Sequence, residues 1–340
     1  MTTRAAGARA VTTSWRGLDA LVLENAALRV TVVPSMGGHV AELVDRAGDR
    51  DLLWHNPRAM PRPAPYGAYF DDWWSGGWDE IFPSGDSSRL HGERLPYMGE
   101  LWCVPWDASL SVTADGQVAS IHAGAFGTIA AARFERRLSL AADEAVLRAH
   151  YRIENLDVRP LPFTWGIHPA FAVGPTHRID HPATAMLVGA SSSPELGVPG
   201  DVYPWPWMPD PTGAIGRRDI SLVRDRDAAV FGGHWATELA DGWLALTDTR
   251  TRRGLAIVFD REVFPCAWLW QVYGGWRGHH HLALEPWTSL PMDLEGAIAA
   301  GRARTLAPGE VLETEVAFVL HEGLERVRGV ERTAGTIVVR

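Results

Sequence analysis

Two residues that can carry acid–base chemistry stand directly before a proline in apolar segments. Glu285 precedes Pro286 in LALEPW, and His168 precedes Pro169 in FTWGIHPAF. A proline has no N–H to donate to a sheet, so we expect a strand to end at each proline, with His168 and Glu285 at the strand termini. An imidazole and a partly desolvated carboxylate can act as general acid and general base. The alternatives are a structural histidine and a simple edge charge.

Further polar and aromatic side chains occur in two glycine-containing segments. GGWDEIFPSGD, residues 76–86, carries Trp78 and Asp79 behind a diglycine, and WQVYGGW, residues 270–276, carries Gln271 and Tyr273. A glycosidase-type pair of carboxylates, such as Asp79 with Glu285, is an open alternative to the histidine–glutamate pair. GxSxG, P-loop and dinucleotide-binding patterns do not occur in a strand–helix context.

The histidine run at residues 279–281 raises the question of a metal site. On a strand, His279 and His281 would share a face, and two imidazoles are a possible start of a zinc site. No cysteine partner or HExxH pattern accompanies them. We therefore expect a solvated turn after Gly278 rather than a metal centre.

Composition excludes several classes of protein. The chain has 340 residues, 46% of them hydrophobic, and a formal charge of −9, which argues against binding nucleic acid. It contains no apolar run of membrane-spanning length, and its first residues lack the apolar core of a signal peptide. Cys103 and Cys266 lie in apolar surroundings typical of free buried thiols. We expect a cytoplasmic monomer or homodimer.

The elements that must position these residues are strands. Apolar and polar residues alternate in segments 18–34, 145–155, 242–260 and 311–323, which is the period of a half-buried strand. The segments 18–34 and 242–260 each predict two strands, the latter turning near Gly254. Only residues 293–303 favour a helix, and a short one. The pattern predicts a single all-β domain over residues 1–340, an antiparallel β-sandwich with few short helices.

Tryptophan is unusually frequent, with 16 residues against 6 tyrosines and 10 phenylalanines. Indole rings stack well on the C–H faces of sugars, although most of them belong in an ordinary aromatic core. Two irregular regions, residues 54–106 and 194–211, are too long for plain connections. We expect the first, which is rich in aromatic residues, to form part of a site wall.

Four segments together resemble the galactose mutarotase-like superfamily, the aldose 1-epimerases and their relatives. They are GGWDEIFPSGD, ENLDVRPLPFTWGIHPAF, WQVYGG and LALEPW. In addition, VVPSMGGHVAELVDRAGDRDLLW resembles the opening of that family, and LAPGEVLETEVAFVL resembles its closing strand. The likeness runs in order over roughly residues 32–320. It implies a large antiparallel β-sandwich, the galactose mutarotase-like supersandwich.

The resemblance also implies a mechanism and a class of ligand. Glu285 would be the general base that deprotonates the anomeric hydroxyl, and His168 the general acid that protonates the ring oxygen. The substrate would be a monosaccharide or a modified sugar, and neither a metal nor an organic cofactor would be required. The substrate-binding residues would be Trp78, Asp79, Glu100, Gln271, Tyr273 and Trp287, with His91 as a further candidate.

One departure from the family pattern concerns the ring-oxygen proton. In PYMGELW, Met98 stands where the family has a histidine, whereas Glu100 and Trp102 are retained. A thioether has no proton to donate, so the proton would have to come from His168, or from His91 if that residue replaces Met98 in space. We then expect activity to fall as pH rises through an ordinary histidine pKa of about 6.5.

Two other functions stay open at this stage. One is a non-catalytic sugar-binding or sensor protein, because a fold does not determine a function. The other is a lyase or hydrolase that uses the same His168 and Glu285 on a modified sugar. An anionic sugar would need a group of arginines, for which Arg62, Arg89, Arg94 and Arg277 are the candidates.

Overall fold

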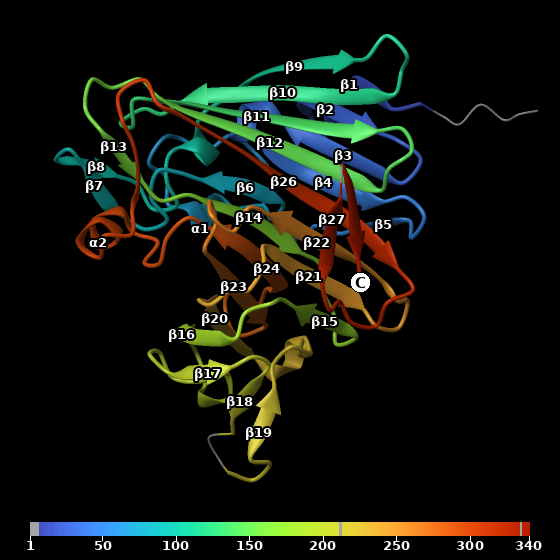
Figure 1. Ribbon diagram of the computed structural model, residues 1–340, viewed down its shortest axis with the longest axis vertical. Coiled ribbons are helices and arrows are strands. Elements are labelled where there is room, and N and C mark those ends of the chain that lie inside the picture. Colours follow the sequence, from blue (N-terminus) through green and yellow to red (C-terminus); the bar gives the residue numbers. More distant parts are fainter. Residues whose placement is uncertain (1–6, 211–212, 334) are drawn as a thin grey trace, which may run out of the picture. The chain divides into compact units, whose positions relative to one another are not determined.

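The chain is built almost entirely from antiparallel strands in a computed structural model that describes residues 7–210, 213–333 and 335–340 (Figure 1). The α-helices in these ranges are α1 (Phe70–Trp73) and α2 (Leu294–Ala299). Single 3-10 turns are η1 (Pro34–Met36), η2 (Leu101–Cys103), η3 (Pro194–Leu196) and η4 (Arg226–Ala228). The predicted all-β fold with few short helices is confirmed.

The chain divides into two compact units. Unit 1 comprises Met1–His168 and Trp287–Ala317, and unit 2 comprises Pro169–Pro286 and Phe318–Arg340. The chain passes from one unit to the other within the strands β14 (Gly166–Phe171), β24 (His280–Trp287) and β26 (Val311–Glu322). No described helix is long and apolar enough to cross a membrane.

Unit 1 contains two sheet segments. The first has the order β1-β2-β3-β4-β6 with β5 paired to β4, and the second has the order β12-β11-β10-β9. The bounds of the first are β1 (Arg9–Trp15), β2 (Leu18–Glu24), β3 (Leu28–Val33), β4 (His39–Asp45), β5 (Arg50–Asp51) and β6 (Trp78–Ile81). Those of the second are β9 (Asp107–Val112), β10 (Val118–Phe126), β11 (Ala132–Ala141) and β12 (Val146–Asn155). Smaller pairs are β7 (Ser88–Leu90) with β8 (Glu93–Leu95), and β13 (Leu161–Phe163) with β25 (Arg304–Leu306).

The two sheet segments of unit 1 pack face to face, with β1 and β2 against β9, β10 and β11 (Figure 1). Strand β12 shows the predicted alternation, because Leu147, Ala149, Tyr151 and Ile153 are fully buried. The side chains between them along the strand are partly exposed. The hydrophobic core of this unit therefore lies between two antiparallel layers, as in a β-sandwich.

Unit 2 has its own strands. One sheet segment has the order β24-β23-β20-β16-β17, and another has the order β15-β21-β22. Their bounds are β15 (His177–Asp180), β16 (Ala185–Ser191), β17 (Val202–Pro204), β20 (Val230–Ala236), β21 (Trp243–Asp248), β22 (Arg253–Phe259) and β23 (Cys266–Tyr273). Two short pairs are β18 (Trp207–Pro209) with β19 (Arg217–Asp219), and β27 (Val330–Thr333) with β28 (Thr336–Val339).

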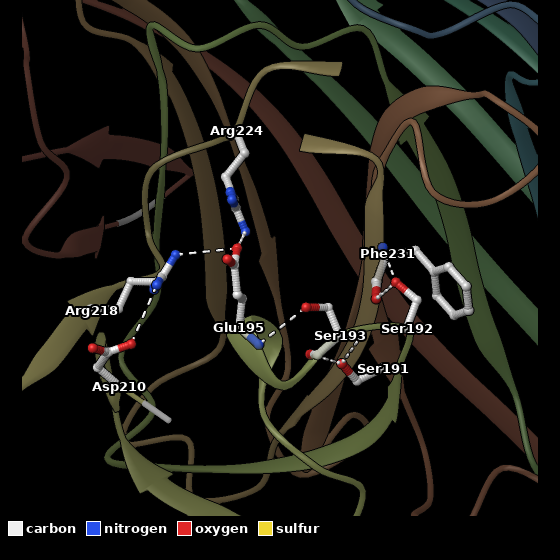
Figure 2. Close-up of polar contacts among 8 residues, drawn as sticks. All are labelled: Ser191, Ser192, Ser193, Glu195, Asp210, Arg218, Arg224 and Phe231. Carbon is white, nitrogen blue, oxygen red and sulfur yellow. Dashed lines mark hydrogen bonds and ion pairs between the residues drawn. The ribbon is translucent and has the colours of Figure 1, made fainter. Parts of the chain in front are cut away.

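The described part of the second irregular region, residues 194–210, contains ion pairs within unit 2, whereas residue 211 lies outside the described residues (Figure 2). Glu195 lies 2.6 Å from Arg224 and 3.4 Å from Arg218, and Arg218 in turn lies 3.4 Å from Asp210. Beside this network, the Ser192 hydroxyl accepts a hydrogen bond from the backbone N–H of Phe231 at 2.8 Å. The ion pairs join this region to β19 and to Arg224, and Ser192 joins the segment just before it to β20.

Most of the elements expected from the sequence are present. Segment 18–34 forms β2 and β3, and the helix expected at 293–303 is α2, capped by Asp293, which accepts from the Gly296 N–H at 2.7 Å. Segment 242–260 forms β21 and β22, but its turn lies at residues 249–252 and Gly254 is already paired in β22. Cys103 and Cys266 are buried free thiols, as expected.

Two expectations about strand ends are wrong. Strand β14 continues through Pro169 to Phe171, and β24 continues through Pro286 to Trp287, so His168 and Glu285 lie inside strands. A proline loses one donor, but its φ is compatible with extended backbone and its carbonyl still accepts. The histidine run is likewise not a solvated turn, because His279 is 4% exposed and His281 is fully buried.

Candidate functional site

His168, in β14 of unit 1, lies in an aromatic environment. Its imidazole packs edge-on against Phe70, with ring centroids 5.6 Å apart, and against Trp74, at 5.3 Å. Both contacts come from helix α1 and the residue that follows it, within the irregular region that was expected to form a site wall. Burial lowers the pKa of His168 to about 4, and the negative charge of Asp79 acts in the opposite direction. His168 is therefore neutral at pH 7 in the ligand-free protein.

Asp79 is the polar group that acts on His168 within unit 1. It is buried in β6, and its Oδ1 accepts from Nδ1 of His39 in β4 at 2.8 Å. The diglycine before β6 makes this approach possible, because a Cβ on Gly77 would overlap the His39 ring, and its φ of 77° suits glycine. Asp79 is thus held by one histidine while it influences the protonation of another.

The next carboxylate, Glu80, points to the opposite face of β6 and belongs to the core. It accepts from Arg136 at 2.9 Å, from Tyr151 at 2.8 Å and from the Trp165 indole at 3.1 Å. Trp78, which shares this face, also donates to Glu80 and is fully buried. The predicted sugar contact of Trp78 stays a prediction, and in the ligand-free chain this indole is engaged in the core of unit 1.

Glu100 and Trp287 are also enclosed in unit 1. Glu100 accepts from the Tyr66 hydroxyl at 2.6 Å and from the backbone N–H groups of Ile129 and Ala130 at 2.7 and 3.1 Å. Trp287 is fully buried, and a Cβ on Gly166 would overlap its ring. Glu100 therefore fixes a loop, and Trp287 packs on the β14 backbone two residues before His168.

Met98 and His91 occupy very different environments. Met98 is buried, 7% exposed, with a φ of 62°. His91 is exposed and forms, with Gly92, the two-residue turn between β7 and β8, in which both residues have positive φ. That His91 takes the place of Met98 in space stays a prediction.

Glu285 lies in β24 of unit 2 and is 2% exposed. Alternation along the strand puts Glu285 on the same face as His281. From His281 a continuous series of aromatic contacts extends across this face. The ring centroid of His279 lies 6.1 Å from that of His281, Trp276 lies 5.2 Å from His279, and Trp270 lies 6.0 Å from Trp276.

Gln271 and Tyr273 are on the other face of β23. The Tyr273 ring contacts His280, at 6.0 Å, and His280 alternates with His281, so Tyr273 and Gln271 point away from the face of Glu285. The Tyr273 hydroxyl donates to Oε1 of Gln271 at 3.1 Å, and both side chains are buried. The structure does not bring these two predicted sugar ligands onto the face that carries Glu285.

The structure adds residues that the sequence analysis did not single out. His39 follows the diglycine Gly37–Gly38, and its position at the start of the strand-like segment HVAELV was its only signal. Trp268 and Trp270 alternate in CAWLWQVY, which was sufficient to place both on one face of a strand. In the part of the chain that the structure describes, no three His, Cys, Asp or Glu side chains gather as metal ligands.

Comparison with known proteins supports the fold. No protein-family model matches the chain. A galactose mutarotase-like protein from Lactobacillus casei is 17% identical, with a TM-score of 0.57 over 89% of this chain and 100% of the other. One from Clostridium acetobutylicum is 13% identical, with a TM-score of 0.60 over 93% and 99%. A candidate aldose 1-epimerase from Klebsiella pneumoniae is 13% identical, with a TM-score of 0.66 over 94% and 89%.

These similarities extend over nearly the whole length of each chain. At such identities they concern the fold alone, and they agree with the antiparallel strands of both units. The chain has the β-sandwich fold of the galactose mutarotase-like proteins.

Proposed function

We propose that this protein is an aldose 1-epimerase that interconverts the α and β anomers of an aldose or a modified sugar. Glu285 takes the proton of the anomeric hydroxyl as the bond between C1 and the ring oxygen breaks, and the ring oxygen receives a proton through His168. Rotation about the C1–C2 bond of the open aldehyde and reclosure give the other anomer. The roles of both residues come from the sequence resemblance.

The observation that carries the proposal is the environment of His168. A histidine that is 4% exposed, enclosed by aromatic rings and adjacent to the charge of a buried aspartate is typical of a catalytic position. The protonated imidazole is the form that can give a proton to a ring oxygen, and the charge of Asp79 favours that form. The fold shared with candidate aldose 1-epimerases supports the same activity.

The pKa of about 4 changes the pH dependence expected from the sequence. A general acid acts in its protonated form, and at pH values above its pKa that form becomes about tenfold rarer with each pH unit. We therefore expect the contribution of His168 to kcat/KM to fall throughout the range from pH 6 to 9, rather than only above a midpoint near pH 6.5.

The test is anomer exchange of glucose and galactose, measured by exchange NMR with catalytic amounts of protein. Glu285→Gln should lower the rate by about 10²–10⁴-fold, the usual loss when a general base is removed. His168→Ala should be comparably damaging. The controls are Glu313→Gln and His122→Ala, which change exposed residues of the same types.

Wild-type exchange rates in Glu285→Gln would contradict the proposal. Sugar binding without any catalysed exchange in the wild-type protein would favour the non-catalytic sugar-binding alternative. Release of a new product from a modified sugar would favour the lyase or hydrolase.

A further inference from the structure

Two tryptophans of unit 2 form a flat aromatic surface on β23. Trp268 and Trp270 are two residues apart and so share a face of the strand. Their ring planes differ by only 10°, with centroids 6.3 Å apart, and both indoles are partly exposed. We call Trp268 and Trp270 the indole platform.

Glycines on the neighbouring strands explain why the rings lie flat. Gly233 in β20 would overlap the Trp268 ring if it carried a Cβ, and a Cβ on Gly189 in β16 would lie 2.7 Å from the same ring. Gly189 is the residue at the β-bulge where the pairing of β16 with β20 shifts register. The Trp268 indole therefore extends over the backbone of two adjacent strands, and the nearly parallel Trp270 has the same orientation.

Tilted rings border the platform. The Phe231 ring is inclined at 53° to Trp270, with centroids 5.3 Å apart, and the Trp276 ring is inclined at 75°, at 6.0 Å. Phe231 is fixed by Ser192, whose hydroxyl both accepts from the Phe231 N–H and donates to its carbonyl oxygen (Figure 2). A flat floor between inclined rings has the shape that accepts the C–H face of a sugar ring.

The indole N–H groups of the platform are available as donors. Within residues 7–210, 213–333 and 335–340, neither Trp268 nor Trp270 donates a side-chain hydrogen bond, and neither N–H is among the buried groups that lack a partner. Each indole thus offers a flat apolar face and a solvent-accessible donor. This combination suits the alternating C–H and hydroxyl groups of a carbohydrate.

The platform lies on the face of unit 2 that carries Glu285. The contacts from Trp270 through Trp276 and His279 to His281 connect it to β24, where Glu285 follows on the same side. Strands β24 and β23 are neighbours in the sheet, so Glu285 and the two indoles lie on one face of adjacent strands.

We infer that the indole platform binds a second sugar ring, so that the substrate is a reducing disaccharide or longer saccharide rather than a free monosaccharide. Which ring reacts rests on the proposed function: the reducing ring, with its free anomeric hydroxyl, is the one at Glu285. The ring attached to it stacks on Trp270 and Trp268. The stacking itself does not depend on catalysis.

The experiment compares binding of glucose with binding of maltose, cellobiose and lactose by titration calorimetry. At least one disaccharide should bind the wild-type protein about tenfold or more tightly than glucose. Trp270→Ala and Trp268→Ala should remove this gain and leave glucose binding unchanged. Trp268→Phe, which keeps an apolar ring over Gly233, covers the case in which Trp268→Ala does not fold. Trp207→Ala removes an exposed tryptophan on β18 and is the matched control.

Equal binding of glucose and all three disaccharides, or a gain that survives both alanine substitutions, would overturn the inference. Anomer exchange of glucose with no gain from a second ring refutes the platform and leaves the proposed function standing. A gain that depends on Trp268 and Trp270 without any catalysed exchange supports the platform and refutes the proposed function.

Discussion

Three tryptophans of unit 1 and two of unit 2 differ in how their N–H groups are used. In unit 1, Trp78 and Trp165 donate to Glu80, Trp106 donates to the Leu101 carbonyl oxygen, and all three indoles are buried. In unit 2, Trp268 and Trp270 are partly exposed, and their N–H groups have no partner in the described parts of the chain. The same residue type closes a core in one unit and forms a surface in the other.

This difference shows what a high tryptophan content can and cannot indicate. Burying an indole N–H costs less when it has a partner, and for Trp78 and Trp165 the partner is Glu80, a buried carboxylate that is itself balanced by Arg136. An indole with its donor in solvent is the one that remains able to bind a ligand. To tell the tryptophans that close a core from those that can bind a ligand, one must know the partner of each indole N–H. The composition of the chain does not reveal these partners.

The largest effect should come from removing Arg136, the cation that pairs with Glu80, the acceptor of the Trp78 and Trp165 indoles. Arg136 is 1% exposed, and its loss leaves the buried Glu80 charge without its counterion. We expect Arg136→Ala to lower the free energy of unfolding by about 3–5 kcal/mol. Urea unfolding followed by circular dichroism measures this change.

The control is Arg137→Ala, one residue further along β11 on the exposed face. It should change stability by less than about 0.5 kcal/mol. Similar losses of unfolding free energy in the two variants would show that the packing of Trp78 and Trp165 around Glu80 does not depend on the buried ion pair.

Acid should weaken unit 2 through its buried histidines. Burial lowers the pKa of His181 to about 3 and those of His234 and His321 to about 4. An unfolded histidine takes up a proton near pH 6.5, before the folded one does, so stability present above that pH is lost as pH falls. The loss is about 1.4 kcal/mol per pH unit for each histidine until the folded pKa is reached.

The measurement is the free energy of unfolding at pH 7 and pH 5. In His234→Gln the free energy of unfolding should depend less steeply on pH, by the uptake of about one proton. The reason is that only this imidazole, which is hydrogen-bonded to the Tyr203 hydroxyl at 2.6 Å, is removed. An unchanged slope in that variant would mean that His234 does not titrate as its burial requires.

Much of the fold could be predicted from the alternation of apolar and polar residues. Strand β12 is an example, because its inward residues are apolar and occur at every second position. The continuation of β14 and β24 through Pro169 and Pro286 could not be predicted, because the local rule that proline ends a strand gives way to pairing of the residues on either side. Sequence patterns of this kind do not reveal such long-range pairing.

The candidate site was predictable in part for a similar reason. The resemblance identified His168 and Asp79, but not His39, which comes from a strand about forty residues earlier. Gln271 and Tyr273 belong to a matching segment, yet alternation along β23 turns them away from Glu285. A motif gives the residues of a segment, whereas the face on which each one lies depends on strand phase and on the neighbouring strands.

The smallest expected effect tests the comparison of tryptophans most directly. Trp165→Phe removes a donor that lies 3.1 Å from Oε2 of the buried Glu80, and a hydrogen bond to a charged group contributes about 1.5–3 kcal/mol. Trp270→Phe removes a donor that faces solvent, so its cost should stay below about 0.5 kcal/mol. Both substitutions remove the same atoms, which makes each the control for the other. Urea unfolding followed by circular dichroism, rather than by the fluorescence of the altered residue, gives the two values. Equal losses of unfolding free energy in the two variants would mean that the N–H groups of Trp165 and Trp270 are used alike. The indole platform would then lose the free donor that distinguishes it from the core tryptophans.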